Sequence, residues 1–133
     1  MLKNTILWAD DDADDLMLMK EILLKNNRHF QIIEVRNGQE VMDYLQNAGQ
    51  KAAYPSLIIL DINMPIMDGK ETLSRIKQSE DFKDIPLVIF TTSNSELDKL
   101  YFRKYQVEMI TKPPNYKSLE KAVLKLISYC QYD

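Results

Sequence analysis

Acidic side chains directly follow two short apolar runs, and they are the residues best suited to carry chemistry. Asp10 and Asp11 come after the run at 6–9, and Asp61 comes after the run at 57–60. Each run is continuous in apolar residues, which is typical of a strand buried on both faces. Carboxylates in such positions can bind a metal ion, and one of them can act as a nucleophile toward phosphorus.

Two further polar side chains stand at the ends of predicted strands in the second half of the chain. Thr91 follows the apolar run at 87–90, and Lys112 follows the predicted strand at 107–111. Because the carboxyl ends of parallel strands lie at one edge of a sheet, we expect these side chains to converge with the three carboxylates. A hydroxyl and an ammonium beside carboxylates fit phosphoryl transfer, in which positioning and charge neutralisation supply most of the catalysis.

The three carboxylates also predict a bound cation. Two like charges about 4 Å apart repel by roughly 4 kcal/mol at an effective dielectric of 20, so the cluster needs a cation or shifted pKa values. An all-oxygen donor set suits Mg²⁺, with Mn²⁺ as the other possibility. The single histidine, His29, precedes the second predicted strand and lies far from this edge, so a zinc site is not expected.

The rest of the sequence predicts the elements that hold the site. Five apolar runs alternate with five amphipathic segments, which indicates a doubly wound α/β domain with a parallel sheet covered on both faces. The strands are expected at 6–9, 30–35, 57–60, 87–90 and 107–111. Four helices are expected at about 12–26, 37–48, 95–105 and 115–130. Another helix, which contains Leu73 and Ile76, is expected between the third and fourth strands.

More aspartates continue the acidic run after the first predicted strand. We interpret Asp12, Asp14 and Asp15 as a solvated helix start, because Asp is favoured at the N-cap and in the first turn. The metal-binding pair could be Asp11 and Asp12 instead of Asp10 and Asp11. Counting from the end of the strand favours Asp10 and Asp11.

Composition excludes several classes of protein. A length of 133 residues fits one domain, and a net charge of −3 argues against nucleic acid as the main partner. No apolar stretch is long enough for a signal peptide or a membrane span. A single cysteine, Cys130, cannot form an internal disulfide, which favours a reducing compartment. We therefore predict a cytoplasmic protein with neither nucleic-acid nor membrane partners.

Four segments of the chain resemble, in order, the signatures of the receiver domain of two-component response regulators, the family that includes the chemotaxis protein CheY. These segments are residues 6–12, 57–69, 85–92 and 110–113. The resemblance implies a flavodoxin-like, five-stranded parallel sheet in the order 2-1-3-4-5 with five helices. It also implies a single receiver domain over residues 1–133 with no output domain.

The resemblance assigns roles to the acidic residues. Asp61 would be the phosphoacceptor and a ligand of Mg²⁺. Asp11 would bind the cation directly, and Asp10 would hold it mainly through water. Asn63 would contribute its backbone carbonyl.

It also assigns roles on the phosphate side of the site. Thr91 and Lys112 would contact the phosphoryl oxygens, and the small Thr92 would leave room for the group. The peptide bond between Lys112 and Pro113 would be cis, which costs roughly 0.5–1 kcal/mol before proline.

The implied function is that of a stand-alone response regulator, a signalling protein that catalyses only its own phosphorylation and dephosphorylation. A histidine kinase or phosphotransfer protein would phosphorylate it. A downstream protein would then read the surface of the fourth helix, fifth strand and fifth helix. The protein would be a monomer or a weak homodimer.

The chain departs from the family pattern near its fifth strand. Met109 occupies the position three residues before the lysine, where receivers usually carry Tyr or Phe, and residues 103–107 lack the usual Gly-Ala turn. An altered output switch is expected, and a scaffold that does not signal through phosphate is the alternative. An aspartyl-phosphate phosphatase ranks last, because Asn63 stands where its general acid would be.

Overall fold

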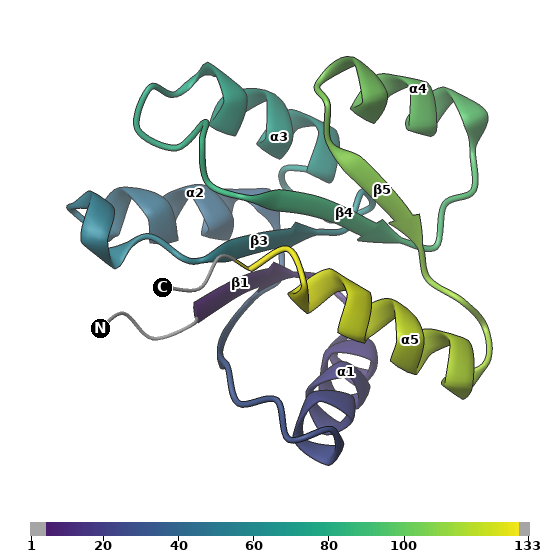
Figure 1. Cartoon of the computed structure of the whole chain (residues 1–133). Coiled ribbons are helices and arrows are strands. Elements are labelled where there is room, and N and C mark those ends of the chain that lie inside the picture. The colour runs from purple at the N-terminus through teal and green to yellow at the C-terminus, as the bar shows by residue number, and fades with distance from the viewer. Residues whose placement is uncertain (1–4, 131–133) are drawn as a thin grey trace.

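One five-stranded parallel sheet forms the centre of the molecule in the computed structural model, which describes residues 5–130 (Figure 1). The strands lie in the order β2-β1-β3-β4-β5, and all four pairings are parallel. The strands are β1 (Thr5–Ala9), β2 (Gln31–Val35), β3 (Leu57–Leu60), β4 (Leu87–Thr91) and β5 (Glu108–Thr111). The predicted doubly wound α/β fold and its strand order are confirmed.

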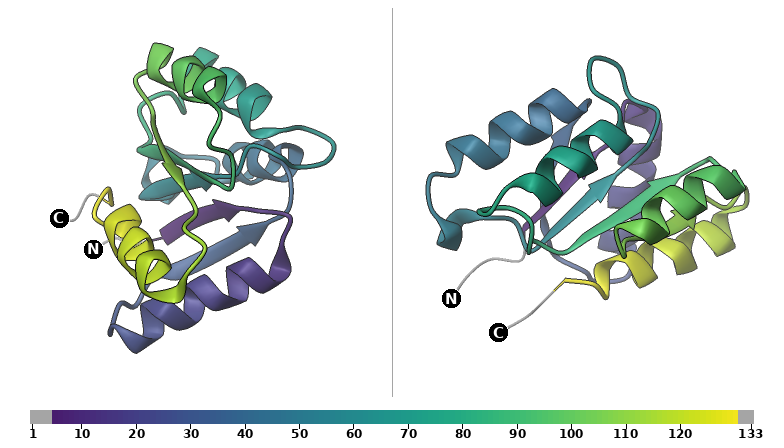
Figure 2. Two further views of the ribbon diagram at one scale, coloured as in Figure 1. Left: turned by 90° about the vertical axis from the view of Figure 1, so that its right-hand side faces the viewer. Right: turned by 90° about the horizontal axis from the view of Figure 1, so that it is seen from above.

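Five α-helices connect and cover the strands. They are α1 (Ala13–Lys25), α2 (Gly38–Asn47), α3 (Gly69–Gln78), α4 (Glu96–Lys104) and α5 (Tyr116–Ile127). Helices α1 and α5 cover one face of the sheet, and α2, α3 and α4 cover the other (Figures 1 and 2). A short 3₁₀ helix, Lys51–Ala53, precedes β3 and was not expected from the sequence. Within the described range, no helix is long and apolar enough to cross a membrane.

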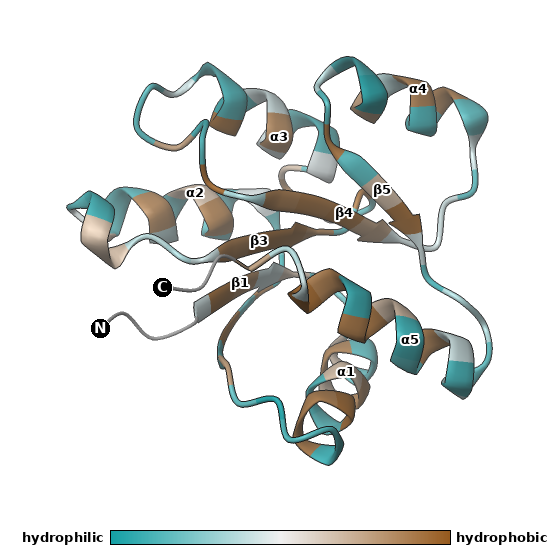
Figure 3. Ribbon diagram, in the orientation of Figure 1, coloured by the Kyte–Doolittle hydropathy of each residue, from teal (hydrophilic) through white to brown (hydrophobic). Residues whose placement is uncertain are grey.

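The sheet separates two apolar cores. Successive residues of a strand point to opposite faces, so Leu7 packs with α2 and α3 while Ile6 and Trp8 pack with α1 and α5. All four residues of β3 are buried, as predicted for a strand covered on both faces. The hydropathy colouring shows the same arrangement, with strongly apolar strands between amphipathic helices (Figure 3).

A polar side chain caps the start of each α-helix by accepting a backbone N–H from its first turn. These caps are Asp12, Asn37, Asp68, Ser95 and Asn115. The predicted roles of Asp12 and Asn37 as helix-start residues are confirmed. Each cap satisfies a donor that the helix itself leaves unpaired, which fixes where the helix begins relative to the strand before it.

The end of α4 explains how the chain manages without the Gly-Ala turn. Gln106 adopts φ 59°, and the N–H of Val107 donates to the Phe102 carbonyl at 3.0 Å. This is the Schellman arrangement, in which a left-handed residue follows the helix. A glutamine therefore occupies the conformation that glycine usually takes, and β5 starts one residue later than predicted.

The peptide bond between Lys112 and Pro113 is a correction. No peptide bond in residues 5–130 is cis, so the expectation drawn from the resemblance is wrong. The trans isomer is the intrinsically preferred one before proline. The backbone N–H of Lys112 still donates to the Thr91 carbonyl at 2.6 Å, which keeps Lys112 at the end of the sheet without the cis bond.

Candidate functional site

Three aspartates meet at the carboxyl edge of the sheet, after β1 and β3. Asp10, Asp11 and Asp61 each offer a carboxylate oxygen within 4.8 Å of the other two. Asp10 is 1% exposed and Asp61 is 7% exposed, while Asp11 is open to solvent. Asp12 instead turns to cap α1, with its Oδ1 accepting from the N–H groups of Asp14 and Asp15. The structure therefore brings the pair Asp10 and Asp11 to Asp61.

Backbone contacts fix the two buried carboxylates. Asp10 Oδ1 accepts the N–H of Asp12 at 3.0 Å, and Asp61 Oδ1 accepts the N–H of Ile62 at 2.7 Å. Burial raises the pKa of Asp10, although hydrogen bonds from Lys112 and Asp12 act in the opposite direction. A buried carboxyl with a raised pKa gains from any cation that approaches it.

The close approach of α3 also positions Asp61. A Cβ on Gly69 would lie 2.2 Å from the Asp61 carbonyl oxygen, and the Gly69 N–H donates to the Ile62 carbonyl at 2.8 Å. Only a residue without a side chain lets the helix begin directly against the segment that carries Asp61.

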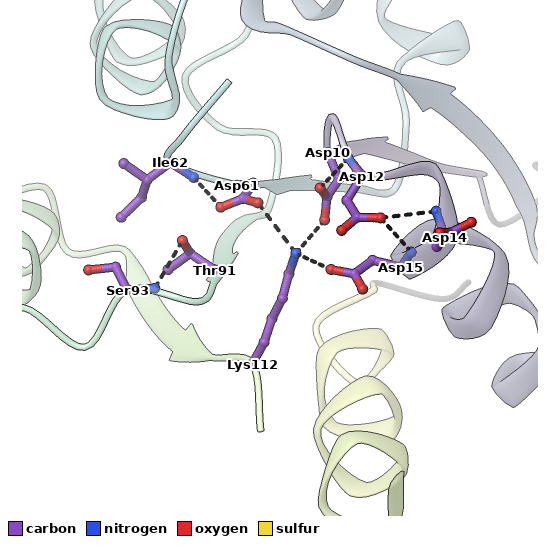
Figure 4. Close-up of polar contacts among 9 residues, drawn as sticks. All are labelled: Asp10, Asp12, Asp14, Asp15, Asp61, Ile62, Thr91, Ser93 and Lys112. Carbon is purple, nitrogen blue, oxygen red and sulfur yellow. Dashed lines mark hydrogen bonds and ion pairs between the residues drawn. The ribbon is translucent and has the colours of Figure 1, made fainter. Parts of the chain in front are cut away.

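Lys112 lies at the centre of the site (Figure 4). Its Nζ contacts Asp10 Oδ2 at 2.5 Å, Asp15 Oδ2 at 3.1 Å and Asp61 Oδ2 at 3.3 Å. Burial acts to lower the pKa of Lys112, but the hydrogen bond with Asp10 and the charges of Asp61 and Asp10 outweigh it, so the pKa is raised. Lys112 is therefore a permanent positive charge near neutral pH.

Thr91 and Asn63 are the remaining residues that the sequence predicts for the site. Thr91 is fully buried at the end of β4, and its Oγ1 accepts the N–H of Ser93 at 3.4 Å (Figure 4). A hydroxyl that accepts through its oxygen still has its own O–H to donate. Asn63 is exposed in the loop after β3, two residues beyond Asp61.

Sequence reasoning missed Asp15 as part of the site. The sequence predicts it as a solvated first-turn residue, yet its carboxylate contacts Lys112. One signal was available: side chains in a helix lean toward its N-terminus. A first-turn residue of a helix that starts at the site edge therefore leans toward the site.

The donor set fits a hard divalent cation. Three carboxylates make an all-oxygen donor set, which Mg²⁺ and Mn²⁺ prefer. The exposure of Asp11 leaves one side open for water and phosphate oxygens.

The site thus places an acidic cluster and a lysine at the carboxyl edge of a doubly wound parallel sheet, an arrangement found in signalling domains of the receiver type. The sequence model of the response regulator receiver domain family matches residues 6–124, and the chain belongs to that family. It is thus a receiver domain of two-component signalling. Receiver domains are signalling proteins that bind divalent metal and interact with histidine kinases and downstream partners.

Curated relatives support the assignment along nearly the whole chain. The response regulator Rcp1 of Synechocystis sp. is 37% identical over 129 residues, which cover 95% of this chain and 88% of that protein. The probable methanogenesis regulatory protein FilR2 of Methanothrix harundinacea is 30% identical over 126 residues, covering 93% of this chain and 81% of that protein.

Solved structures agree with the fold. The phosphorylated cyanobacterial phytochrome response regulator RcpA matches with a TM-score of 0.85 and 33% identity, over 98% of this chain and 94% of that chain. The Mn²⁺-bound form of Rcp1 matches with a TM-score of 0.82 and 36% identity, over 94% of this chain and 92% of that chain.

Proposed function

We propose that this receiver accepts a phosphoryl group on Asp61 from a histidine kinase or a phosphotransfer protein, with Mg²⁺ as the cofactor. The observation that carries the proposal is the position of Asp61. Its carboxylate is buried at the end of β3, within 4.8 Å of the Asp10 and Asp11 carboxylates and 3.3 Å from the Lys112 ammonium.

The reaction needs few groups from the protein. A carboxylate oxygen of Asp61 attacks the phosphorus of a phosphohistidine, a P–O bond forms and the P–N bond breaks. The electron pair of the broken bond stays on the imidazole. The nucleophile is already an anion, so no general base is required.

The carboxylates of Asp10, Asp11 and Asp61, with the backbone carbonyl of Asn63, would hold the cation. When bound, Mg²⁺ would neutralise negative charge on the carboxylates and on the phosphoryl group that is transferred.

Lys112 and Thr91 would bind the phosphoryl oxygens. Lys112 is a fixed positive charge, and the Thr91 hydroxyl keeps its proton available while accepting from Ser93. Movement of Thr91 toward a phosphoryl group would lengthen this already long 3.4 Å contact with Ser93 and so alter the segment before α4.

The proposed output surface comprises α4, β5 and α5. On α4, Leu97 and Leu100 are 78% and 54% exposed, which offers apolar contacts to a downstream protein. Met109 on β5 is half-buried against the core beneath α4. A methionine can repack when α4 shifts, but it cannot repeat the inward swing of an aromatic ring.

Phosphotransfer from purified histidine kinases tests the proposal. We expect labelled phosphate on the wild-type chain in the presence of Mg²⁺, none after chelation, and none on Asp61→Asn, which keeps the shape but removes the nucleophilic anion. Labelling that survives in Asp61→Asn would contradict the assignment of the phosphoacceptor.

One observation favours a second candidate, a receiver-fold scaffold that acts without phosphorylation. Met109 stands where the switching aromatic of receivers is found. Beryllofluoride with Mg²⁺ discriminates between the two, because it occupies a phosphoacceptor site without a kinase. If no adduct forms and the fluorescence of Trp8 on β1 is unchanged, the scaffold is favoured.

A further inference from the structure

The Lys112 ammonium uses all of its hydrogen-bonding capacity on three carboxylates. An ammonium has three N–H donors, and the acceptors are Asp10, Asp15 and Asp61. Asp10 and Asp61 belong to the cluster suited to a divalent cation. Asp15 is outside that cluster, so it is the one partner of Lys112 that a cation would leave available.

Asp15 is held in place by the start of α1. Its backbone N–H donates to Asp12 Oδ1 at 3.1 Å, which fixes the first turn at the edge of the site. Its side chain is 39% exposed, whereas that of Asp10 is 1% exposed. In Figure 4 the Lys112 ammonium lies between Asp61 on one side and Asp10 and the more exposed Asp15 on the other.

A divalent cation bound to Asp10 and Asp61 would compete with Lys112 for these carboxylates. Asp10 Oδ2 lies 2.5 Å from the ammonium, and a cation bound to Asp10 and Asp61 would repel that ammonium at close range. The Lys112 ammonium can move away from these oxygens at a low cost in free energy only if another carboxylate accepts its hydrogen bonds.

We propose that Asp15 is a positioning residue for Lys112: it holds the ammonium on the α1 side of the site when a divalent cation binds Asp10 and Asp61. Asp15 thereby reduces the competition between Lys112 and the cation. It also keeps Lys112 within reach of the phosphoryl group. The inference rests on the proposed function only in naming Mg²⁺ as the cation.

Titration of the unphosphorylated protein with Mg²⁺ tests the proposal. We expect Asp15→Asn to weaken Mg²⁺ binding roughly two- to fivefold, since a partly exposed ion pair has a modest effect. Asp14→Asn is the matched control. Asp14 is the neighbouring residue, its side chain is exposed and has no contact to Lys112, and the substitution removes the same charge. Asp15→Glu keeps the charge and should restore most of the affinity.

A double-mutant cycle separates an effect of Asp15 on the position of Lys112 from a direct effect of the Asp15 charge on the cation. In a Lys112→Met background there is no ammonium to compete, so Asp15→Asn should weaken Mg²⁺ binding no more than Asp14→Asn does. The NMR signal of the Lys112 side chain should also change in Asp15→Asn and stay unchanged in Asp14→Asn.

The outcomes distinguish this proposal from the proposed function. Equal effects of Asp15→Asn and Asp14→Asn in the wild-type background, or an undiminished effect of Asp15→Asn without Lys112, would overturn the role of Asp15 alone. A wild-type protein that binds no Mg²⁺ would overturn the metal site and this inference together.

Discussion

Ile66 stands out at the scale of single residues, because its backbone conformation conflicts with its side chain. It adopts φ 70°, and the N–H of Met67 donates across it to the Pro65 carbonyl at 2.7 Å. This is a three-residue turn whose positive-φ form is rare and strained. A β-branched residue is especially unfavourable there, and Ile66 is 81% exposed, so packing offers little compensation.

Replacing Ile66 should therefore stabilise the protein. We expect Ile66→Gly to raise the free energy of unfolding by about 0.5–1 kcal/mol, because relief of the strain exceeds the entropy that glycine adds to the unfolded chain. Urea unfolding measures the change. Ile66→Val keeps the branched Cβ and should give no gain, and a gain as large as that of glycine would show that strain is not the cause.

At the scale of elements, Asp98 links α4 to its surroundings. Its Oδ2 accepts the Ser93 hydroxyl at 2.6 Å, and its Oδ1 lies 2.6 Å from the Nζ of Lys70 on α3. The Ser93 carbonyl in turn accepts the Thr111 hydroxyl of β5 at 2.8 Å. The segment between Thr91 and α4 is thus bonded to α4 and β5 through Ser93, and Asp98 links the same end of α4 to α3.

Removal of the Asp98 charge should lower the free energy of unfolding by an amount that depends on pH. The pKa of Asp98 is lowered, first by the hydrogen bond from Lys70 and then by that from Ser93. Such a group stabilises the fold above its unfolded pKa of about 3.9 and loses this contribution as the pH falls through its lower folded value. We expect Asp98→Asn to lower the free energy of unfolding by about 1 kcal/mol at neutral pH.

Urea unfolding at neutral pH and at about pH 3 measures the Asp98 contribution. The difference between wild type and Asp98→Asn should shrink at the lower pH. Asp81→Asn is the control, because Asp81 is exposed and accepts no hydrogen bond through its carboxylate in the described part of the chain. A cost that is the same at both values of pH would contradict the ionic origin of the effect.

At the scale of the whole molecule, Cys130 packs at the end of the chain's described part, in the apolar core between the sheet and helices α1 and α5. Its side chain is 5% exposed, and the neighbouring Tyr129 hydroxyl donates to Glu108 on β5. The segment after α5 is therefore packed against the sheet.

Cys130 should report on unfolding of this core. Burial raises the pKa of its thiol to about 11, so little thiolate is present near neutral pH. We expect slow reaction with a thiol reagent in the native protein and fast reaction once urea unfolds it. A native rate close to that of a cysteine peptide would show that the segment opens without global unfolding.

Local patterns made much of the fold predictable. The continuous apolar run at 57–60 predicted a buried strand, which the structure confirms. Asn37 with Glu40 predicted a helix start, which the bond from the Glu40 N–H to Asn37 Oδ1 confirms. These features depend on neighbours within a few residues. The isomer of the peptide bond between Lys112 and Pro113 was not predictable in this way, because both isomers are accessible before proline. The left-handed Gln106 was not predictable either, because glycine is the residue that usually signals this conformation.

The sequence by itself determined which residues end the strands, and therefore that Asp10, Asp11, Asp61, Thr91 and Lys112 share one edge of a parallel sheet. Only the tertiary structure decided which carboxylates Lys112 contacts. Its partners Asp10 and Asp15 lie 102 and 97 residues away along the chain. Contacts over such separations depend on how strand ends and a helix start are placed to within an ångström, which residue types and spacing do not encode locally.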